Sequence, residues 1–232
     1  MRERMIEIFY THFSSRFPDE RWNEYLSNMP GSIRDRINRY KRWQDRQGVL
    51  LGKLLLLEGL KGYGYRCDCL NHVLSDENGR PFLDDRIDFN ISHSDEYTVC
   101  TLSDRGKVGI DIERIKEVDL SDFRNYLTPK EREIIAQSED PYRDFYKIWT
   151  IKESVLKADG RGLSASLLDV DIEGKKAVWD GQIWFLNEIN INPSYVCHVA
   201  SNFLSPRFFV RECQFLITRP SLLFPREISV LP

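Results

Sequence analysis

The sequence contains no long uninterrupted apolar run, and its first residues, MRERMIEIFYTHF, mix charged and apolar side chains. We therefore expect neither a signal peptide nor a membrane-spanning segment. An excess of one charge sign is also missing, because 33 Lys and Arg face 36 Asp and Glu, for a net charge of -3. No global field favours binding to nucleic acid or to an anionic membrane, so any basic site must be local.

Cysteine is scarce and irregularly placed. The five cysteines are an odd number and follow no spacing typical of a disulfide framework. This favours reduced thiols and a cytoplasmic location. Apolar residues are not lacking: 41% of the 232 residues are hydrophobic, which is enough for the core of one large domain or two small ones.

Periodicity and turn signals predict an α+β arrangement with a boundary in the turn SDRG, giving halves at 1–105 and 106–232. A capping box at Thr128 to Glu131, with Pro129 between, predicts the start of a short helix, and Gly160 the end of a longer one. The predicted helical regions are 32–64, 127–135 and 142–160, and the predicted strands are 6–13, two within 87–103, 108–115, and a closing antiparallel sheet from 167–174, 181–188, 194–200 and 207–217.

The stretch VGIDIERI places two acids in an otherwise buried strand. Successive side chains of a strand point to opposite faces, so Val108, Ile110 and Ile112 share one face. Asp111 and Glu113 are neighbours on the other face. Two adjacent carboxylates near a core require a solvent-exposed face, a basic partner or a bound cation.

Further polar residues are placed to complete such a site. Glu153 and Lys157 lie four residues apart on one helix face, which by itself is equally the pattern of an ordinary surface ion pair. If Glu153 faces the two strand acids, three carboxylates with a nearby lysine suit a hard cation and a phosphorylated ligand. His93 follows a short apolar run, where a structural role is the alternative to a phosphate donor. A basic run suits either solvent or an acidic partner, and it comprises Arg34, Arg36, Arg39, Lys41, Arg42 and Arg46.

Four motifs, GRPFL, FNISHS, VGIDIE and WTIKESVLKADGRGL, occur in this order at sensible separations. In these motifs the chain resembles the Sfp-type 4'-phosphopantetheinyl transferases. The resemblance implies a fold of two similar α/β halves related by a pseudo-twofold axis. It also implies Mg2+-dependent transfer of the 4'-phosphopantetheine arm of coenzyme A to a serine of an apo acyl or peptidyl carrier protein, with release of 3',5'-adenosine bisphosphate.

The resemblance also implies roles for individual residues. Asp111, Glu113 and Glu153 match the acids that bind Mg2+, although the family's glutamate at the position of Glu153 has also been read as the base for the incoming serine. Lys157 matches the lysine that contacts the pyrophosphate.

The coenzyme A contacts are implied in the same way. Ser92 and His93 match residues that contact the phosphates of the coenzyme, and Arg80 with Pro81 matches the dipeptide beside the adenine. Arg36 approximately matches another basic position of the family.

One position departs from the family pattern. The chain reads DRQGVLLG where the family often has a pattern like DRxRSLAG, so Gly48 stands in place of a phosphate-binding arginine. We expect Arg46, Arg36 or Arg34 to substitute for it.

Two other functions remain open. A Mg2+-dependent nucleotide diphosphate hydrolase would use the same acids, although no P-loop is present. A non-catalytic module that binds coenzyme A or a carrier protein finds its only support in Gly48. Two fused halves predict a monomer, and the identity of the carrier stays open.

Overall fold

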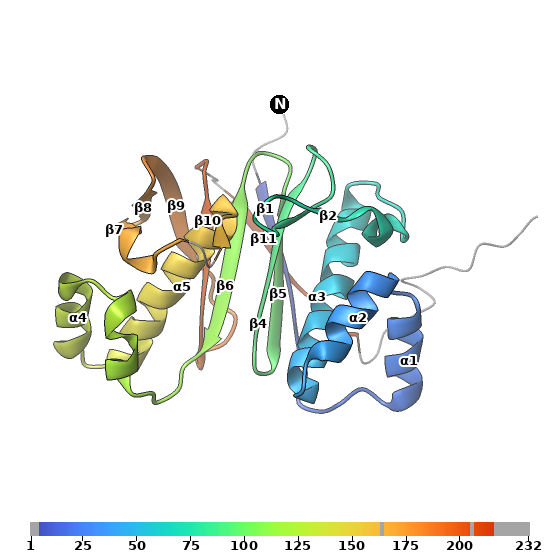
Figure 1. Ribbon diagram of the computed structural model, residues 1–232, viewed down its shortest axis with the longest axis horizontal. Coiled ribbons are helices and arrows are strands. Elements are labelled where there is room, and N and C mark those ends of the chain that lie inside the picture. The colour runs from blue at the N-terminus through green and yellow to red at the C-terminus, as the bar shows by residue number, and fades with distance from the viewer. Residues whose placement is uncertain (1–4, 163–164, 205–206, 216–232) are drawn as a thin grey trace, which may run out of the picture.

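The computed structural model describes residues 5–162, 165–204 and 207–215. It shows two large sheets side by side, each covered by one long helix, and a small two-stranded sheet of Leu74–Ser75 and Pro81–Phe82 (Figure 1). The helices are α1 (Asp19–Ser27), α2 (Gly31–Arg39), α3 (Trp43–Gly62), α4 (Pro129–Ala136) and α5 (Pro141–Asp159). The strands are β1 (Met5–His12), β2 (Leu74–Ser75), β3 (Pro81–Phe82), β4 (Asp88–Ser94), β5 (Tyr97–Ser103), β6 (Val108–Arg114), β7 (Asp171–Glu173), β8 (Lys176–Trp179), β9 (Gln182–Glu188), β10 (Tyr195–Ser201) and β11 (Arg207–Glu212).

The two halves repeat one topology. The first sheet has the strand order β11-β1-β5-β4 and the second β6-β10-β9-β8-β7. In each repeat the first strand pairs antiparallel with a later strand of the same half, as β1 does with β5 and β6 with β10. A long helix, α3 or α5, lies between them in sequence. The predicted α+β fold with two similar halves is thus confirmed.

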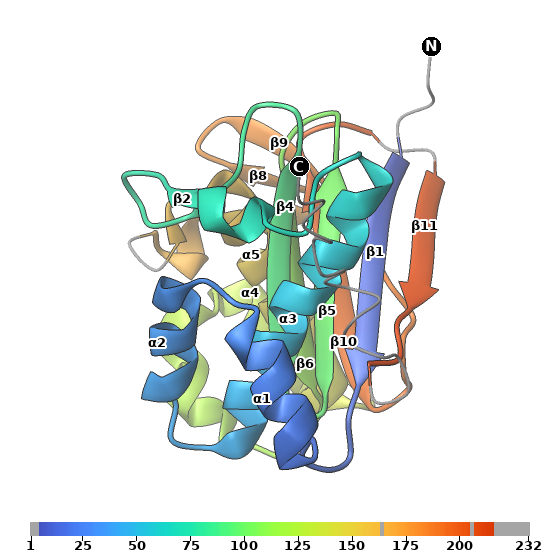
Figure 2. The same ribbon diagram turned by 90° about the vertical axis from the view of Figure 1, so that its right-hand side faces the viewer.

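The first half carries an additional helical layer. Helices α1, α2 and α3 stand in front of the first sheet, whose outer edge is β11, with β1 next to it (Figure 2). Helix α3 is buried along most of its length because its leucines fill the core of this half. The strands β4 and β6 are the edges of their sheets that face each other at the centre of the molecule (Figure 1).

The ends of the second-half helices follow the sequence signals. The Oγ1 of Thr128 accepts the N–H of Glu131, and the carboxylate of Glu131 accepts the N–H of Thr128, so the capping box is confirmed. Helix α5 ends at Asp159, and Gly160, the residue after it, has a φ of 102°. Glycine adopts this left-handed backbone conformation easily, and the conformation ends the helix.

Three details of the predicted fold were wrong. The region 32–64 is two helices, because the chain turns extended at Tyr40, and α1 was not predicted. The last predicted strand, 207–217, was assigned to a closing antiparallel sheet. Its described part contains β11, which pairs in parallel with β1 of the first half, while residues 216–217 lie outside the described residues. Alternating hydrophobicity identifies a strand but not its partner.

Two observations concern the composition. Among the described residues, no helix combines the length and hydrophobicity needed to cross a bilayer. All five cysteines are free thiols, as the irregular spacing predicted, and four of them are buried.

Candidate active site at the seam between the halves

The site is built on β6. Asp111 is only 2% exposed, while Val108, Ile110 and Ile112 belong to the hydrophobic core between the sheets. Glu113 is half-buried on the same face as Asp111. The predicted alternation along this strand is therefore confirmed, and it directs both carboxylates away from the apolar core.

Helix α5 contacts β6 closely enough to add its own polar side chains. A Cβ on Gly109 would clash with the backbone of Ser154 and Ala158, so glycine at this position permits the contact. The Nζ of Lys157 lies 2.5 Å from Oδ1 of Asp111. Glu153 is near enough for its charge to interact with those of Asp111 and Lys157.

Strand β4 supplies a row of polar side chains that joins it to β6. Because β4 and β6 belong to different sheets, these side chains replace backbone pairing at the seam. The bonds are from Val108 N to Asp88 Oδ2 (2.7 Å), from Ile110 N to Asn90 Oδ1 (3.1 Å), from Ser92 Oγ to Asp111 Oδ1 (2.8 Å), and from Ser94 Oγ to Glu113 Oε2 (2.7 Å).

Of this row, the sequence motifs gave a role only to Ser92; Asn90 and Ser94 lie in the motif FNISHS without a role of their own, and Asp88 was missed. The signal that points to them is a polar residue at every second position of the strand, in the pattern DFNISHS. An edge strand with one polar face is suited to such a seam.

The pKa shifts in the site reflect its burial and the closeness of its carboxylates to one another. Burial raises the pKa of Glu113 to about 7, and the Asp111 carboxylate adds to this effect. Burial, followed by Asp111, also raises the pKa of Glu153. For Lys157, burial is the largest single influence and opposes the ammonium form, but Asp111, Glu153 and Glu113 together outweigh it and the pKa is raised. Lys157 is therefore cationic at neutral pH, while burial and the neighbouring acids shift both glutamates towards the protonated form.

The site offers the type of donor that a hard cation takes, although its side chains are not gathered around one point. The Oδ2 atom of Asp111 is buried and has no hydrogen-bond partner within the described residues. Carboxylate oxygens are the ligands that Mg2+ prefers. As the side chains lie, however, no three His, Cys, Asp or Glu residues in the described ranges form a metal-holding group. The ammonium of Lys157 already neutralises part of the charge on Asp111.

His93 lies on the other face of β4 from Ser92, against α3. A Cβ built on Gly48 would lie 3.2 Å from Cγ of His93. The absence of a side chain at Gly48 therefore leaves room for the imidazole. Burial lowers the pKa of His93, and Arg36 and Lys157 act in the same direction, while nearby acids oppose them. The glycine that departs from the family pattern is thus a packing contact of a predicted site residue.

Lys53 of α3 was missed by sequence analysis. Burial lowers its pKa to about 8, and the charge of Arg36 adds to this effect. A half-buried lysine near an arginine is an electropositive point that a phosphate would stabilise. The sequence around Lys53 gives little indication of a functional site, because the residue stands among the leucines of a helix.

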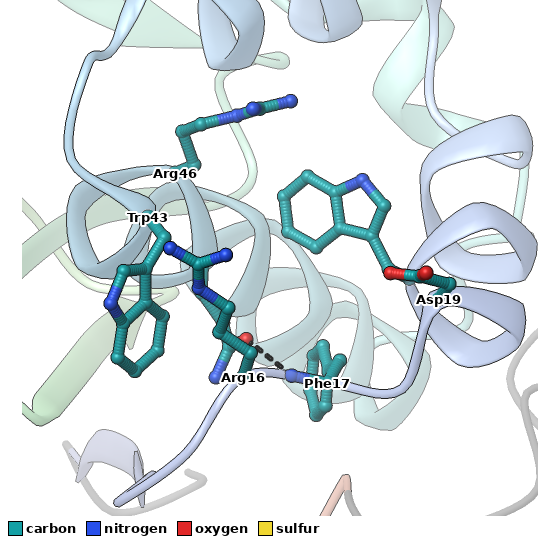
Figure 3. Close-up of a pocket in the computed structure, with 7 residues that line it drawn as sticks. Arg16, Phe17, Asp19, Trp43 and Arg46 are labelled. Carbon is teal, nitrogen blue, oxygen red and sulfur yellow. Dashed lines mark hydrogen bonds between the residues drawn. The ribbon is translucent and has the colours of Figure 1, made fainter.

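Arg46, one of the residues expected to replace the missing arginine, is engaged elsewhere. Its guanidinium lies 5.3 Å from the ring centre of Trp22 and donates to Asn38 Oδ1 at 2.9 Å. It lines a cavity of about 140 Å³ with Arg16 and Trp43, among others (Figure 3). This cavity shares none of its lining residues with the carboxylate site.

Arg80 and Pro81 differ in their placement. Pro81 begins β3 and is half-buried, whereas the guanidinium of Arg80 is buried and bonded to the end of α5 and to β6. Arg36 lies exposed on α2.

Comparison with known proteins identifies the family. A family model described as the 4'-phosphopantetheinyl transferase superfamily matches residues 107–197. The chain is 36% identical over 168 residues to 4'-phosphopantetheinyl transferase gsp of Aneurinibacillus migulanus, with 68% of each chain covered. It is 27% identical over 232 residues to 4'-phosphopantetheinyl transferase Sfp of Bacillus subtilis (strain 168), with 97% of each covered. A solved structure, the holo-[acyl-carrier-protein] synthase (AcpS) of Thermotoga maritima, aligns with a TM-score of 0.33 and 18% identity over 40% of this chain and 61% of that chain. The chain therefore belongs to the 4'-phosphopantetheinyl transferase superfamily and is an enzyme of that family.

Proposed function

We propose that this enzyme transfers the 4'-phosphopantetheine group of coenzyme A to a serine of an apo acyl or peptidyl carrier protein, in a Mg2+-dependent reaction that releases 3',5'-adenosine bisphosphate. The observation that carries the proposal is the seam between the halves. There the ammonium of Lys157 contacts both Asp111 and Ser92, at 2.5 Å and 3.0 Å, beside two further carboxylates. This combination of acids and a cation suits a pyrophosphate with a bound metal ion.

Asp111 is the first candidate to hold Mg2+, because its buried Oδ2 lacks a partner among the described residues. Glu113 and Glu153 are the further candidates, since a bound cation would offset both the burial and the repulsion by Asp111 that raise their pKa values. When bound, Mg2+ neutralises pyrophosphate charge and orients the phosphates. A rigid strand holds Asp111 and Glu113 more precisely than a loop would.

The chain's own residues supply the rest of the chemistry. Serine Oγ of the carrier attacks the phosphorus that bears the pantetheine arm, and the bond to the adenosine bisphosphate oxygen breaks. Lys157 stays protonated and stabilises the negative charge that develops on the phosphate oxygens. The raised pKa of Glu153 suits it to accept the serine proton, which makes it a candidate base as well as a candidate metal ligand. His93 is proposed as a donor to the coenzyme's phosphates.

We also propose the oligomeric state of the enzyme, the surface that contacts the carrier and the place of action. Both sides of the seam come from one chain, which supports action as a monomer. The basic residues of α2 and of the segment that follows it are exposed and suit an acidic carrier surface. Reduced thiols favour the cytoplasm as the place of action.

Intact-mass spectrometry of several apo carrier proteins tests the proposal. Each carrier is incubated with the enzyme, coenzyme A and Mg2+, with EDTA in a parallel sample, and the modified peptide is sequenced. We expect a metal-dependent gain of one phosphopantetheine on a single serine. Cleavage of coenzyme A without carrier modification would indicate a hydrolase instead. Bound coenzyme A with no change to any carrier would indicate a binding module.

A further inference from the structure

The guanidinium of Arg80 joins three elements of the fold. Arg80 is 9% exposed and directly precedes β3 in the chain. Its four acceptors are Lys157 O at 2.5 Å, Ala158 O, Asp88 Oδ2 at 2.6 Å and Val108 O at 3.0 Å. A fork of N–H donors in fixed geometry can satisfy such a set, whereas a single ammonium cannot.

Two of these acceptors belong to the last turn of α5. The final carbonyls of a helix have no partner within the helix, and a cation there is stabilised by the helix dipole. Arg80 therefore caps the end of α5 from outside, in addition to the turn at Gly160. The contact is tight, because a Cβ on Gly160 would lie 3.0 Å from Cδ of Arg80.

The other two acceptors belong to the seam. Asp88 begins β4, and its Oδ2 accepts from both the guanidinium of Arg80 and the N–H of Val108. Val108 begins β6, the strand that carries Asp111. Arg80 thus fastens the helix that carries Lys157 to the strand that carries Asp111.

We propose that Arg80 is a positioning residue that holds α5 against β6 and so fixes Lys157 and Glu153 relative to Asp111. The family resemblance implied an adenine contact, but all of the guanidinium contacts above are made within the protein. The inference deepens the proposed function and rests on it for the kinetic part of its test. A displacement of about 1 Å in a catalytic group can cost about 100-fold in rate.

The variant R80K separates the two roles because it keeps the charge and loses the fork. If Arg80 positions α5, kcat should fall by about 10-fold to 100-fold while KM for coenzyme A changes little. If Arg80 binds adenine, KM should rise with kcat unchanged. R86K is the matched control, since Arg86 is in the same segment but exposed and paired with Asp84 at the surface. It should behave as wild type.

The variant D88N provides a second approach that does not alter Arg80. It should weaken the ion pair between residue 88 and Arg80 and lower kcat in the same way. Because both variants act through one network, the double variant R80K/D88N should be little slower than the slower single variant. Independent, multiplying losses would show that the two residues act separately and would overturn the proposal. If R80A does not fold, the conservative variants R80K and D88N still test the proposal.

Hydrogen exchange supplies a readout that does not depend on activity. In R80K the amides of residues 150–160 should exchange faster than in wild type, while those of α3 should be unchanged. Methylguanidinium added to R80A should restore protection there and raise kcat. Faster exchange, a kcat loss and rescue would together support the proposal. Unchanged exchange, or a rise in KM alone, would overturn it. If wild type transfers nothing to any carrier, the proposed function fails, and exchange alone decides the role of Arg80.

Discussion

Replacing Lys152 by methionine tests the buried ion pair that fastens α4 to α5. The Nζ of Lys152 lies 2.7 Å from Oε2 of Glu131, and the two side chains are 1% and 10% exposed. The same carboxylate oxygen accepts the N–H of Thr128 at 2.7 Å in the capping box of α4. Lys152 directly precedes Glu153, so the pair also supports the helix that carries the site.

The size of the effect follows from the unpaired charge. K152M leaves the carboxylate of Glu131 largely buried without its cation, which should cost roughly 3–5 kcal/mol. In a chain of this size this loss corresponds to a fall in Tm of roughly 6–20 °C. The double variant K152M/E131Q retains a glutamine, which also serves in a capping box, and leaves no charge unpaired. It should be at least as stable as K152M.

Denaturant unfolding followed by tryptophan fluorescence measures these free energies. The matched control is K147M on the same helix, because Lys147 pairs with Asp144 at 3.5 Å with side chains 39% and 32% exposed. It should lose less than about 1 kcal/mol. A loss for K152M as small as that of the control would refute the reasoning. So would a double variant whose loss equals the sum of the two single losses.

Three further variants test other contacts. Burial lowers the pKa of His198 from 6.5 to about 4, so between these values the unfolded chain binds a proton that the folded chain does not. The free energy of unfolding should therefore fall by roughly 3 kcal/mol between pH 7 and pH 4, and denaturant titrations of H198N should lose this slope. G48R should crowd His93 and cost roughly 1–3 kcal/mol, and an unchanged Tm would contradict that packing. N90A leaves the N–H of Ile110 without its acceptor and should cost roughly 1–3 kcal/mol in the same titration, whereas a neutral effect would show that the seam bond is unimportant.

Local signals predicted the elements that carry the site. The alternation around Asp111 identified β6, and the capping box and Gly160 identified α4 and the end of α5. These signals depend on a few neighbouring residues, which is why they are readable without the fold. The spacing of Glu153 and Lys157 placed both on one helix face but left the partner of that face undetermined.

Contacts between distant segments were not predictable in this way. The parallel pairing of β11 with β1 joins the two ends of the described chain, and no local pattern specifies a partner strand. The inward direction of Arg80 depends on acceptors that the fold brings from α5 and β6. The contact of Gly48 with His93 likewise requires α3 and β4 to be placed first. Non-local packing decides these positions.

The most direct test of the central claim compares wild type with D111N in a single carrier-modification assay. Apo carrier, coenzyme A and each enzyme are incubated with Mg2+ or with EDTA, and the carrier is weighed by intact-mass spectrometry after circular dichroism has shown that D111N is folded. We predict one added phosphopantetheine with wild type and Mg2+ only, and none with D111N. Transfer by folded D111N at the wild-type rate, or transfer by wild type unaffected by EDTA, would contradict the account.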